Sequence, residues 1–512
     1  MADTKREIER KYEATPETKL PKLSKVVGVS AVVDHGTAEL DAVYYDTAEL
    51  RLAAASITLR RRTGGSDAGW HLKLPVAPGV RDEIGAPLSD ELPRSLAALV
   101  RARVRGADLV PVVRLRSTRR IQVLTDADGN PLAELSRDAV RAERLDDGEG
   151  RTAAWDEIEV ELADDADPAI LDAVEQKLTK AGIRAADSPS KLARALDETG
   201  LAAPRAALDT GAERSAEPQT AGDHILVYLR EQVVALLAYD PGVRRDLPDA
   251  VHQMRVATRR LRSAFRSFRK VLDRTVTDPI GEELKWLAGE LGVARDQEVL
   301  TERLRAGIAE IPRTLLLGPV RGRLRIYTAA HGAGSRRKAL TALDNKRYLA
   351  LLATLEALLA EPPLLGAAAK PPEEALPKAM AKDYGRLADR ITHALELPAG
   401  DERDLALHEA RKAAKRARYA GEAAKSALGK PAKRFAKRMK AVQTVLGDHQ
   451  DSVVAREALR NLAIQAHAAG ESAFAWGLLY GREEWAAAEL ERKLPEVWAK
   501  AAPEQLGGVL DG

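Results

Sequence analysis

The chain has 512 residues, with 80 Lys and Arg against 77 Asp and Glu, so its formal net charge is only +3. This length exceeds one ordinary domain core and predicts two or three folded domains. The absence of cysteine excludes disulfides, thiolate metal sites and thiol nucleophiles. The first residues lack an apolar signal segment, and no apolar run is long enough to cross a bilayer, so we expect a cytoplasmic protein.

Residues 1–200 carry short alternating segments such as LDAVYYDT, ITLRRR and WDEIEVEL, separated by turn signals. Period-2 alternation predicts antiparallel strands. Two stretches with helical spacing interrupt them, near Leu92 to Arg105 and near Pro168 to Gly182. The sequence therefore predicts an N-terminal α+β domain dominated by β-strands.

Residues 201–221 are rich in Ala, Pro, Gly and Thr without periodicity, which is typical of a linker. Residues 222–510 are almost continuously helical in pattern, with breaks at PRTLLLGP and between Glu361 and Pro377. We expect an all-α domain here, divided at the second break into two halves, about 222–360 and 376–502.

The two helical halves repeat each other. A pattern of one His and three basic residues recurs 156 positions later: His252, Arg255, Arg259 and Arg262 match His408, Arg411, Lys415 and Arg418. Lys285 and Asp296 recur 155 positions later as Lys440 and Asp451. A slip of one residue over this distance indicates a duplicated helical unit.

Charged residues alternate along several predicted strands of the first domain. Glu7, Glu9 and Lys11 share one face of the first strand, which alone is as typical of a solvated sheet face as of a site. The same alternation recurs on four further strands, at Arg60 and Arg62, His71 and Lys73, Arg114 and Arg116, and Glu157, Glu159 and Glu161. In a barrel packed on its outside, this pattern predicts a charged interior that holds a charged ligand.

The types of charge indicate which ligand. Clustered carboxylates are hard oxygen donors that suit Mg²⁺ or Mn²⁺, and surrounding Arg and Lys side chains suit phosphate oxygens. Together they predict metal-assisted phosphoryl chemistry.

The E-x-E-x-K pattern at Glu7, the basic strands and the late E-x-E strand resemble the CYTH family of triphosphate tunnel metalloenzymes, over about residues 5–200. The resemblance implies an eight-stranded antiparallel closed tunnel. Family members include inorganic triphosphatases, thiamine triphosphatases and one class of adenylyl cyclase.

The same resemblance implies roles for individual residues. The metal ligands would be Glu7, Glu9, Glu157, Glu159 and Glu161, with Mg²⁺ or Mn²⁺ as cofactor. The catalytic group would comprise Glu7, Glu9, Lys11, Glu159 and Glu161. The phosphates would contact Lys11, Arg60, Arg62, Lys73, Arg114, Arg116, Arg119 and Lys191. Glu134 and Asp138 would line the tunnel, although these two, Arg119 and Lys191 could equally be partners in surface ion pairs.

Basic residues form one stripe of each predicted helix that follows a repeated His. The stretch 252–270 contains no acidic residue, and 411–440 carries twelve Lys or Arg against Glu422 alone. Like charges three or four positions apart repel, so a bound polyanion would relieve the helix. A solvated charged helix is the alternative for either stripe taken singly.

The duplicated helices with a His at the head of each basic stripe resemble the CHAD family, over about residues 220–500. The resemblance implies two helical bundles around a basic groove that binds inorganic polyphosphate. The implied binding residues are His252, Arg255, Arg259, Arg262, Lys285, His408, Arg411, Lys415, Arg418, Lys433, Lys437 and Lys440.

Three functions follow as hypotheses. The first is an enzyme whose tunnel hydrolyses inorganic triphosphate or polyphosphate while the helical domain binds polyphosphate. We expect this enzyme to have no membrane partner and to lie in the cytoplasm or on polyphosphate granules. The second is a polyphosphate-binding protein without catalysis. The third, a nucleic-acid binder, is less favoured because only Tyr419 and Phe435 accompany the second basic stripe. A nucleotide cyclase is also less favoured, since no nucleobase pocket is evident.

Overall fold

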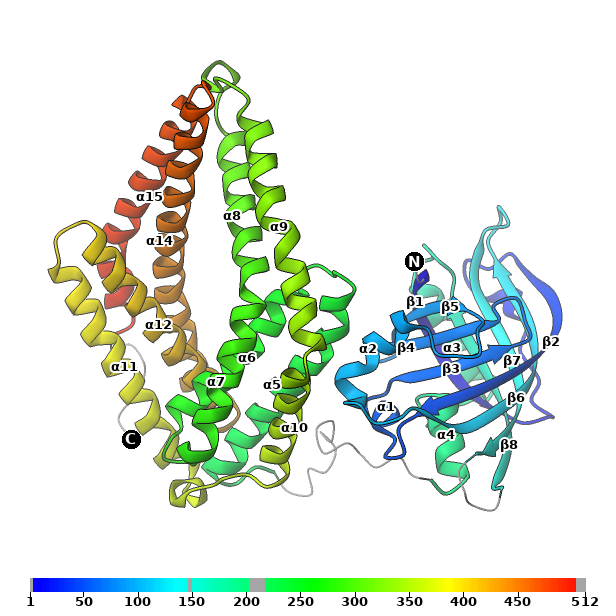
Figure 1. Ribbon diagram of the computed structural model, residues 1–512. Coiled ribbons are helices and arrows are strands. Elements are labelled where there is room, and N and C mark those ends of the chain that lie inside the picture. The colour runs from blue at the N-terminus through cyan, green and yellow to red at the C-terminus, as the bar shows by residue number, and fades with distance from the viewer. Residues whose placement is uncertain (1–2, 146–149, 202–216, 503–512) are drawn as a thin grey trace. The chain divides into compact units, whose positions relative to one another are not determined.

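The computed structural model describes residues 3–145, 150–201 and 217–502 (Figure 1). The chain divides into two compact units, Met1–Thr210 and Gly211–Gly512. Of the predicted linker, residues 202–216 lie outside the described part of the chain. Within that part, no helix combines the length and apolar character needed to cross a membrane.

The N-terminal unit is a closed barrel of eight antiparallel strands, as the predicted fold class requires. In chain order the strands are β1 (Asp3–Ala14), β2 (Ala31–Asp46), β3 (Thr58–Thr63), β4 (Gly69–Ala77), β5 (Val80–Pro87), β6 (Val110–Thr125), β7 (Pro131–Arg144) and β8 (Thr152–Leu162). Around the barrel they follow the order β1-β5-β4-β3-β2-β6-β7-β8. A short 3-10 turn, Leu23–Lys25, and α1 (Arg51–Ala54) lie between strands.

Strand β1 closes the barrel because its two halves pair with different neighbours. Residues 3–8 pair with β5, and residues 9–14 pair with β8. The E-x-E-x-K segment spans this change of partner. Its side chains therefore stand where strands from both ends of the sheet meet.

Apolar side chains cover the outside of the barrel under two helices. Tyr12, Ile158 and Val160 pack with the apolar stripe of α3 (Ala169–Lys180). Leu59, Trp70, Leu72 and Ile84 pack with α2 (Arg94–Val104) in a second cluster. Both helices fall within the two stretches that the sequence predicts to be helical. Since the strand face turned outward is apolar, the alternate residues face the interior, and many of these are charged.

A short helix, α4 (Lys191–Glu198), packs at one end of the barrel (Figure 1). Leu192, Ala195 and Leu196 join Tyr44 and other apolar residues of β2, β6, β7 and β8 in one cluster. The Ser190 side chain accepts a hydrogen bond from the Ala193 amide at 3.1 Å and so caps the helix. This cap fixes the position of Lys191, the first residue of α4.

The C-terminal unit is entirely helical in its described residues. Its first half holds α5 (Ala221–Arg244), α6 (Ala250–Ser267), α7 (Arg274–Glu290), α8 (Gly292–Ala309), α9 (Val320–Asp344) and α10 (Lys346–Ala360), with a 3-10 turn at Arg313–Leu315. The second half follows another turn, Gly366–Ala369, and holds α11 (Pro372–Glu396), α12 (Asp401–Ala423), α13 (Lys425–Leu428), α14 (Lys430–Ala468) and α15 (Phe474–Ala499). Thr220 and Asp223 form a capping box at the start of α5.

The duplicated pattern falls on corresponding helices. The first basic stripe lies mainly on α6, and the second begins on α12 and continues onto α14. Helices α6 and α12 pack against each other. The long α14 takes the place of α7 and α8 together, because the break at Leu291 has no counterpart in the second half. Alanines such as Ala410, Ala414 and Ala417 form the buried face of α12, and their small side chains let neighbouring helices approach closely.

Candidate functional site

A cavity of about 420 Å³ lies inside the barrel, and charged side chains from most of its strands line it. Its carboxylates are Glu7, Glu9, Asp67, Glu83, Glu134, Glu159 and Glu161. Its cations are Lys5, Lys11, Arg60, Arg62, Lys73, Arg81, Arg119 and Lys191. Removing this many charges from water is expensive unless they pair with one another or a charged ligand fills the space.

The junction of β1 and β8 gathers the carboxylates of both E-x-E patterns. Glu9 stands opposite Glu161 in the strand register, and Lys11 stands opposite Glu159. The Lys11 ammonium lies 3.1 Å from Glu9 Oε2 and also contacts Glu159. Lys5 Nζ lies 2.5 Å from Glu161 Oε1. The structure therefore brings together the two glutamate pairs that lie about 150 residues apart in the sequence.

Glu7 forms a second carboxylate pair with Glu83 of β5. Lys73 Nζ lies 2.5 Å from Glu7 Oε2 and 3.4 Å from Glu83 Oε2. Burial and the neighbouring Glu83 carboxylate raise the pKa of Glu7 to about 8. Glu7 therefore keeps a proton at neutral pH, and a divalent cation is the kind of ligand that would displace it. With Glu9, Glu159 and Glu161 on the same cavity, the oxygen donors fit Mg²⁺ or Mn²⁺.

A different acidic group does not fit a metal. Asp138, Glu157 and Glu159 each place a carboxylate oxygen within 4.8 Å of the others. However, Lys191 Nζ lies 3.0, 2.5 and 2.6 Å from these three carboxylates. The ammonium takes the place that a cation would need.

The prediction that Glu157 is a metal ligand is corrected by this arrangement. Besides contacting Lys191, Glu157 accepts a hydrogen bond of 2.6 Å from the Trp155 indole. It is absent from the cavity lining, because it lies deeper in the barrel beside α4. Its role is to hold Lys191 in place.

Arg119 and Lys191 both hold Glu159. Arg119 donates to Asp138 at 2.8 and 2.7 Å and to Glu159 at 2.8 Å. Although burial opposes the shift, Lys11, Lys191 and Arg119 hold the pKa of Glu159 well below its usual range. Glu159 is therefore ionised and fixed in orientation at the cavity wall.

Positive charge is not fully balanced on the other side of the cavity. Arg62 is only 5 % exposed, and its one ion pair within the described residues joins it to Asp67. Burial, followed by the nearby Arg60 and Arg119, lowers the pKa of Arg62 to about 9. A guanidinium stays charged at neutral pH, so this lowered pKa indicates a positive potential that phosphate oxygens would balance.

Arg114 and Arg116 do not face the cavity, and the prediction that they do is wrong. Arg114 donates to Asp41 at 2.9 and 2.5 Å, and more than half of the Arg116 side chain is exposed. Side chains alternate along a strand. Arg119 faces the interior, so the residues three and five positions before it face outward.

Several residues of the cavity were not predicted from the sequence, among them Tyr44 on β2, and Arg81 and Glu83 on β5. The Tyr44 hydroxyl accepts a hydrogen bond from Arg60 at 3.4 Å. The signal for the other two was present, because Arg81 and Glu83 alternate in VRDEIG as the charged residues of the neighbouring strands do.

In the helical unit, the basic stripes of α6 and α12 face each other. Burial, followed by Arg411 of its own helix and Arg259 of α6, lowers the pKa of Lys415 to about 7. Arg255 adds to this effect, while Asp451 opposes it. We call Arg255, Arg259, Arg411 and Lys415 the central basic cluster. The positive charges meet across the seam between the two repeats, as expected of a groove that binds an anion.

A second basic cavity of about 400 Å³ contains the predicted residue Arg262. Five further arginines line it, namely Arg266, Arg269, Arg274, Arg386 and Arg416, against the acidic residues Asp278 and Glu282. Burial and Arg266 lower the pKa of Arg262. The sequence stripe gave no sign of Arg386, which comes from α11.

The other predicted groove residues occupy several settings. Arg255 donates to Asp296 at 3.1 Å, and Arg418 donates to Glu422 at 2.8 Å, so their charge is partly balanced within the protein. Lys285 pairs with Glu282 at 3.0 Å. Exposed positions on α14 hold Lys433, Lys437 and Lys440.

The two repeated histidines have different surroundings. His408 Nδ1 lies 2.5 Å from Gln450 Oε1, and burial lowers the pKa of His408. His252 instead lines a separate cavity of about 940 Å³, together with residues such as Gln297 and Thr301.

Comparison with known proteins places each unit. Residues 5–196 match the model of the CYTH domain, and residues 227–460 match that of the CHAD domain. The uncharacterized protein Rv2226 of Mycobacterium tuberculosis is 40 % identical over 494 residues, 93 % of this chain and 92 % of that protein.

Two solved structures illustrate the separate units. The CHAD domain of the plant Ricinus communis has 25 % identity and a TM-score of 0.39, covering 58 % of this chain and 94 % of its own. HpAC1 of Hippeastrum, described as a putative adenylyl cyclase with a dominant triphosphatase activity, has 18 % identity and a TM-score of 0.23, covering 39 % of this chain and 96 % of its own.

Proposed function

Because the chain belongs to the family of proteins that join a CYTH domain to a CHAD domain, we propose that its barrel hydrolyses phosphoanhydride bonds of inorganic triphosphate or polyphosphate with a divalent metal. We propose further that the helical unit binds polyphosphate.

One observation carries the proposal for the barrel: a single cavity holds ionised carboxylates and incompletely balanced arginines. Glu9 and Glu159 supply buried negative charge at the β1–β8 junction, while Arg62 leaves positive potential on the same cavity. A metal ion would bind to the first group, and a chain of phosphates would bind to the second.

In this proposal Glu7, Glu9, Glu159 and Glu161 hold Mg²⁺ or Mn²⁺, which supplies neutralisation of phosphate charge and activation of water. Lys11, Arg60, Arg62, Lys73 and Arg119 bind and orient the phosphate chain. The same cations stabilise the negative charge that develops on the leaving phosphate. Lys191 acts one step further away, since it holds Glu159 through an ion pair of 2.6 Å.

For the helical unit, the central basic cluster supports binding of an extended polyanion. Burial and the neighbouring arginines lower the pKa of Lys415 to about 7 and so disfavour its charged form. A bound phosphate would favour the charged form again. Binding of long polyphosphate to the helical unit would also raise the local concentration of polyphosphate at the tunnel, because both units belong to one polypeptide. A protein that binds polyphosphate in this way would associate with polyphosphate granules in the cell.

Nucleic acid is a weaker candidate for the groove. Proteins that bind single strands without sequence preference stack bases on accessible aromatic rings. Near the second stripe, Tyr419 is buried and Phe435 is fully buried, so neither ring offers a free face. A polyphosphate-binding protein with an inactive tunnel remains the second candidate, supported by the basic groove alone.

Phosphate release from tripolyphosphate, with Mg²⁺ or Mn²⁺, tests the tunnel. We expect release by the wild type, loss of release in Glu7→Gln/Glu9→Gln, and unchanged release in the control Arg116→Gln, whose side chain lies outside the barrel. Equal rates in the wild type and the double variant would refute the assignment of these carboxylates.

Polyphosphate binding tests the groove separately. The substitution pair Arg259→Gln/Lys415→Gln should weaken binding of long polyphosphate by the full chain, while Arg325→Gln/Lys338→Gln, which removes two cations from α9, should leave it nearly unchanged. Equal weakening by both pairs would indicate non-specific attraction to positive charge rather than a groove.

A further inference from the structure

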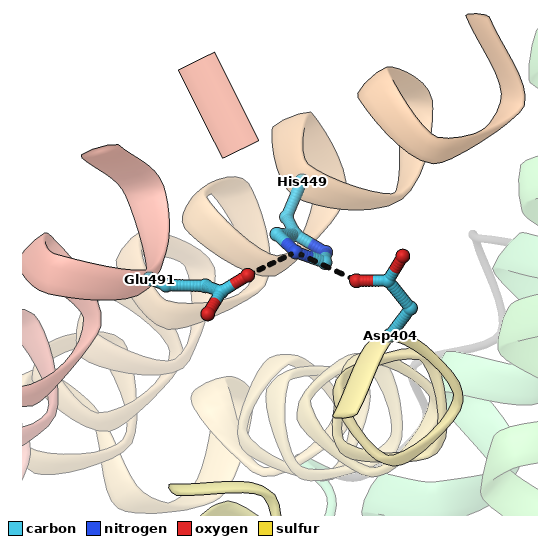
Figure 2. Close-up of side chains that lie close together, drawn as sticks. All are labelled: Asp404, His449 and Glu491. Carbon is cyan, nitrogen blue, oxygen red and sulfur yellow. Dashed lines mark hydrogen bonds and ion pairs between the residues drawn. The ribbon is translucent and has the colours of Figure 1, made fainter. Parts of the chain in front are cut away.

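Asp404, His449 and Glu491 converge in the second half of the helical unit, from three different helices (Figure 2). Asp404 lies on α12, His449 on α14 and Glu491 on α15. His449 Nε2 lies 3.2 Å from Glu491 Oε1 and 3.4 Å from Asp404 Oδ1. The His449 side chain is 3 % exposed, whereas Asp404 and Glu491 are 15 % and 17 % exposed. The group is therefore shielded but within reach of solvent.

Each carboxylate uses its two oxygens differently. The inner oxygens, Asp404 Oδ1 and Glu491 Oε1, face the His449 ring nitrogen. The outer oxygens accept hydrogen bonds from arginines: Arg456 donates to Asp404 Oδ2 at 2.7 Å, and Arg403 donates to Glu491 Oε2 at 2.8 Å. Metal-binding carboxylates are commonly held in this way by a second set of hydrogen bonds, which orients the free oxygen toward the ion.

The distances from His449 Nε2 to the two inner oxygens match one type of coordination. Ligands about 2.0–2.1 Å from a zinc ion at tetrahedral angles lie about 3.3 Å apart. Ligands at the same distance in an octahedral magnesium site lie about 2.9 Å apart. The observed separations of 3.2 and 3.4 Å agree with the tetrahedral value. An imidazole nitrogen with two carboxylate oxygens is also a donor set that suits zinc better than magnesium.

Hydrogen bonding alone explains the arrangement less well. The hydrogen bond between His449 Nε2 and Glu491 Oε1 at 3.2 Å uses the single N–H that Nε2 can carry, so Asp404 Oδ1 at 3.4 Å is left without it. One cation between the three atoms satisfies all of them.

The arrangement is also not shared packing of the repeat. The positions that correspond to Asp404 and His449 in the first half, at offsets of 156 and 155, are Pro248 and Ala294.

We propose that Asp404 Oδ1, His449 Nε2 and Glu491 Oε1 bind a zinc ion, with water as the fourth ligand. Arg403 and Arg456 hold the two carboxylates in position. The ion links α12, α14 and α15, and it is separate from the metal of the barrel, whose ligands lie in the other unit. Its consequence is a helical unit that unfolds at a higher temperature when zinc is bound.

The test uses the full chain carrying Glu7→Gln/Glu9→Gln, which removes two of the four proposed metal ligands in the barrel. Equilibrium dialysis against Zn²⁺ with elemental analysis should give one bound ion per chain. Replacement by Co²⁺ should give the intense visible absorption of a tetrahedral site. Adding His449→Gln should remove both signals, whereas His467→Gln, an exposed histidine of the same helix, should remove neither.

Asp404→Asn and Glu491→Gln provide a second measurement in case His449→Gln does not fold. Each should weaken zinc binding by about tenfold or more. The proposal is overturned if the tunnel-variant chain binds no zinc, or if the Co²⁺ absorption is the weak one of an octahedral site. It is also overturned if binding survives the loss of Asp404 or Glu491. None of these outcomes depends on hydrolysis by the barrel, so failure here leaves the proposed function untouched.

Discussion

Replacing Lys191 by Met should destabilise the barrel more than any exposed substitution. Met is similar in size, but it leaves Asp138, Glu157 and Glu159 without the ammonium that lies within 3.0 Å of all three. Breaking a buried ion pair on one side costs about 3–5 kcal/mol. For a domain of this size, about 2–4 °C per kcal/mol converts that cost to a fall of about 6–20 °C in the unfolding temperature.

The loss should also depend on pH. In the wild type, despite opposition from burial, Lys191 and Arg119 hold the pKa of Asp138 below its usual range. Asp138 therefore contributes stability above its unfolded pKa, and this contribution is lost as the pH falls through its folded pKa. Without Lys191, burial raises the pKa values of the remaining carboxylates. The variant then gains stability relative to the wild type as the pH is lowered.

Hydrogen exchange of β8 amides is the assay, because it reports on the barrel separately from the helical unit. Lys180→Met, at an exposed position of α3, is the matched control and should change little. If β8 exchange in Lys191→Met equals that of the control between pH 5 and pH 8, the ion-pair network does not stabilise the barrel as described.

Three further predictions concern single side chains. Polyphosphate affinity should fall as the pH rises from about 6 to 9, because the Lys415 pKa of about 7 must rise on binding and a proton is taken up; Lys415→Arg should flatten this profile, as measured by calorimetry at constant ionic strength. Ser190→Ala should cost about 1 kcal/mol at the start of α4, seen as faster exchange of the Ala193 amide, and an unchanged rate would contradict the observed cap. Arg62→Gln should reduce kcat/KM for tripolyphosphate, whereas Arg114→Gln on the outer face should not.

Much of the barrel could be predicted because alternation along a strand is local information. Glu7, Glu9 and Lys11 share a face whatever else the chain does, and the apolar partners Ile158 and Val160 define the opposite face of β8. The order of the strands and the change of partner in β1 depend on pairing between distant segments. The eight-stranded tunnel was therefore expected from family resemblance rather than from the residues.

The errors in the site have the same origin. Arg114 and Arg116 were assigned to the phosphates together with Arg119 by family resemblance, although an odd separation along a strand places them on the opposite face. Glu157 does face the interior of the barrel, but it lies beside Lys191 rather than beside the cavity. The position of Lys191 depends on how α4 packs on the barrel, which the sequence does not reveal. Glu83 was missed although it alternates with Arg81 along β5 as the charged residues of the neighbouring strands do.

In the helices, the repeat predicted which residues correspond but not how the two copies meet. The packing of α6 on α12 is a long-range contact, and it places Arg259 beside Lys415. Arg386, by contrast, enters the second basic cavity from α11, whose basic residues are not part of the repeated pattern. The group of Asp404, His449 and Glu491 could not be predicted, since its three residues are distant in sequence and come from three helices.

The most direct test of the account is the rate of orthophosphate release, in the presence of Mg²⁺, from tripolyphosphate and from long polyphosphate. The account predicts that the wild type releases phosphate from both and that Glu7→Gln/Glu9→Gln releases it from neither. Arg259→Gln/Lys415→Gln should retain the tripolyphosphate rate but require a higher concentration of the long chain. Absence of release by the wild type with either Mg²⁺ or Mn²⁺ would contradict a catalytic tunnel and leave a protein that only binds polyphosphate.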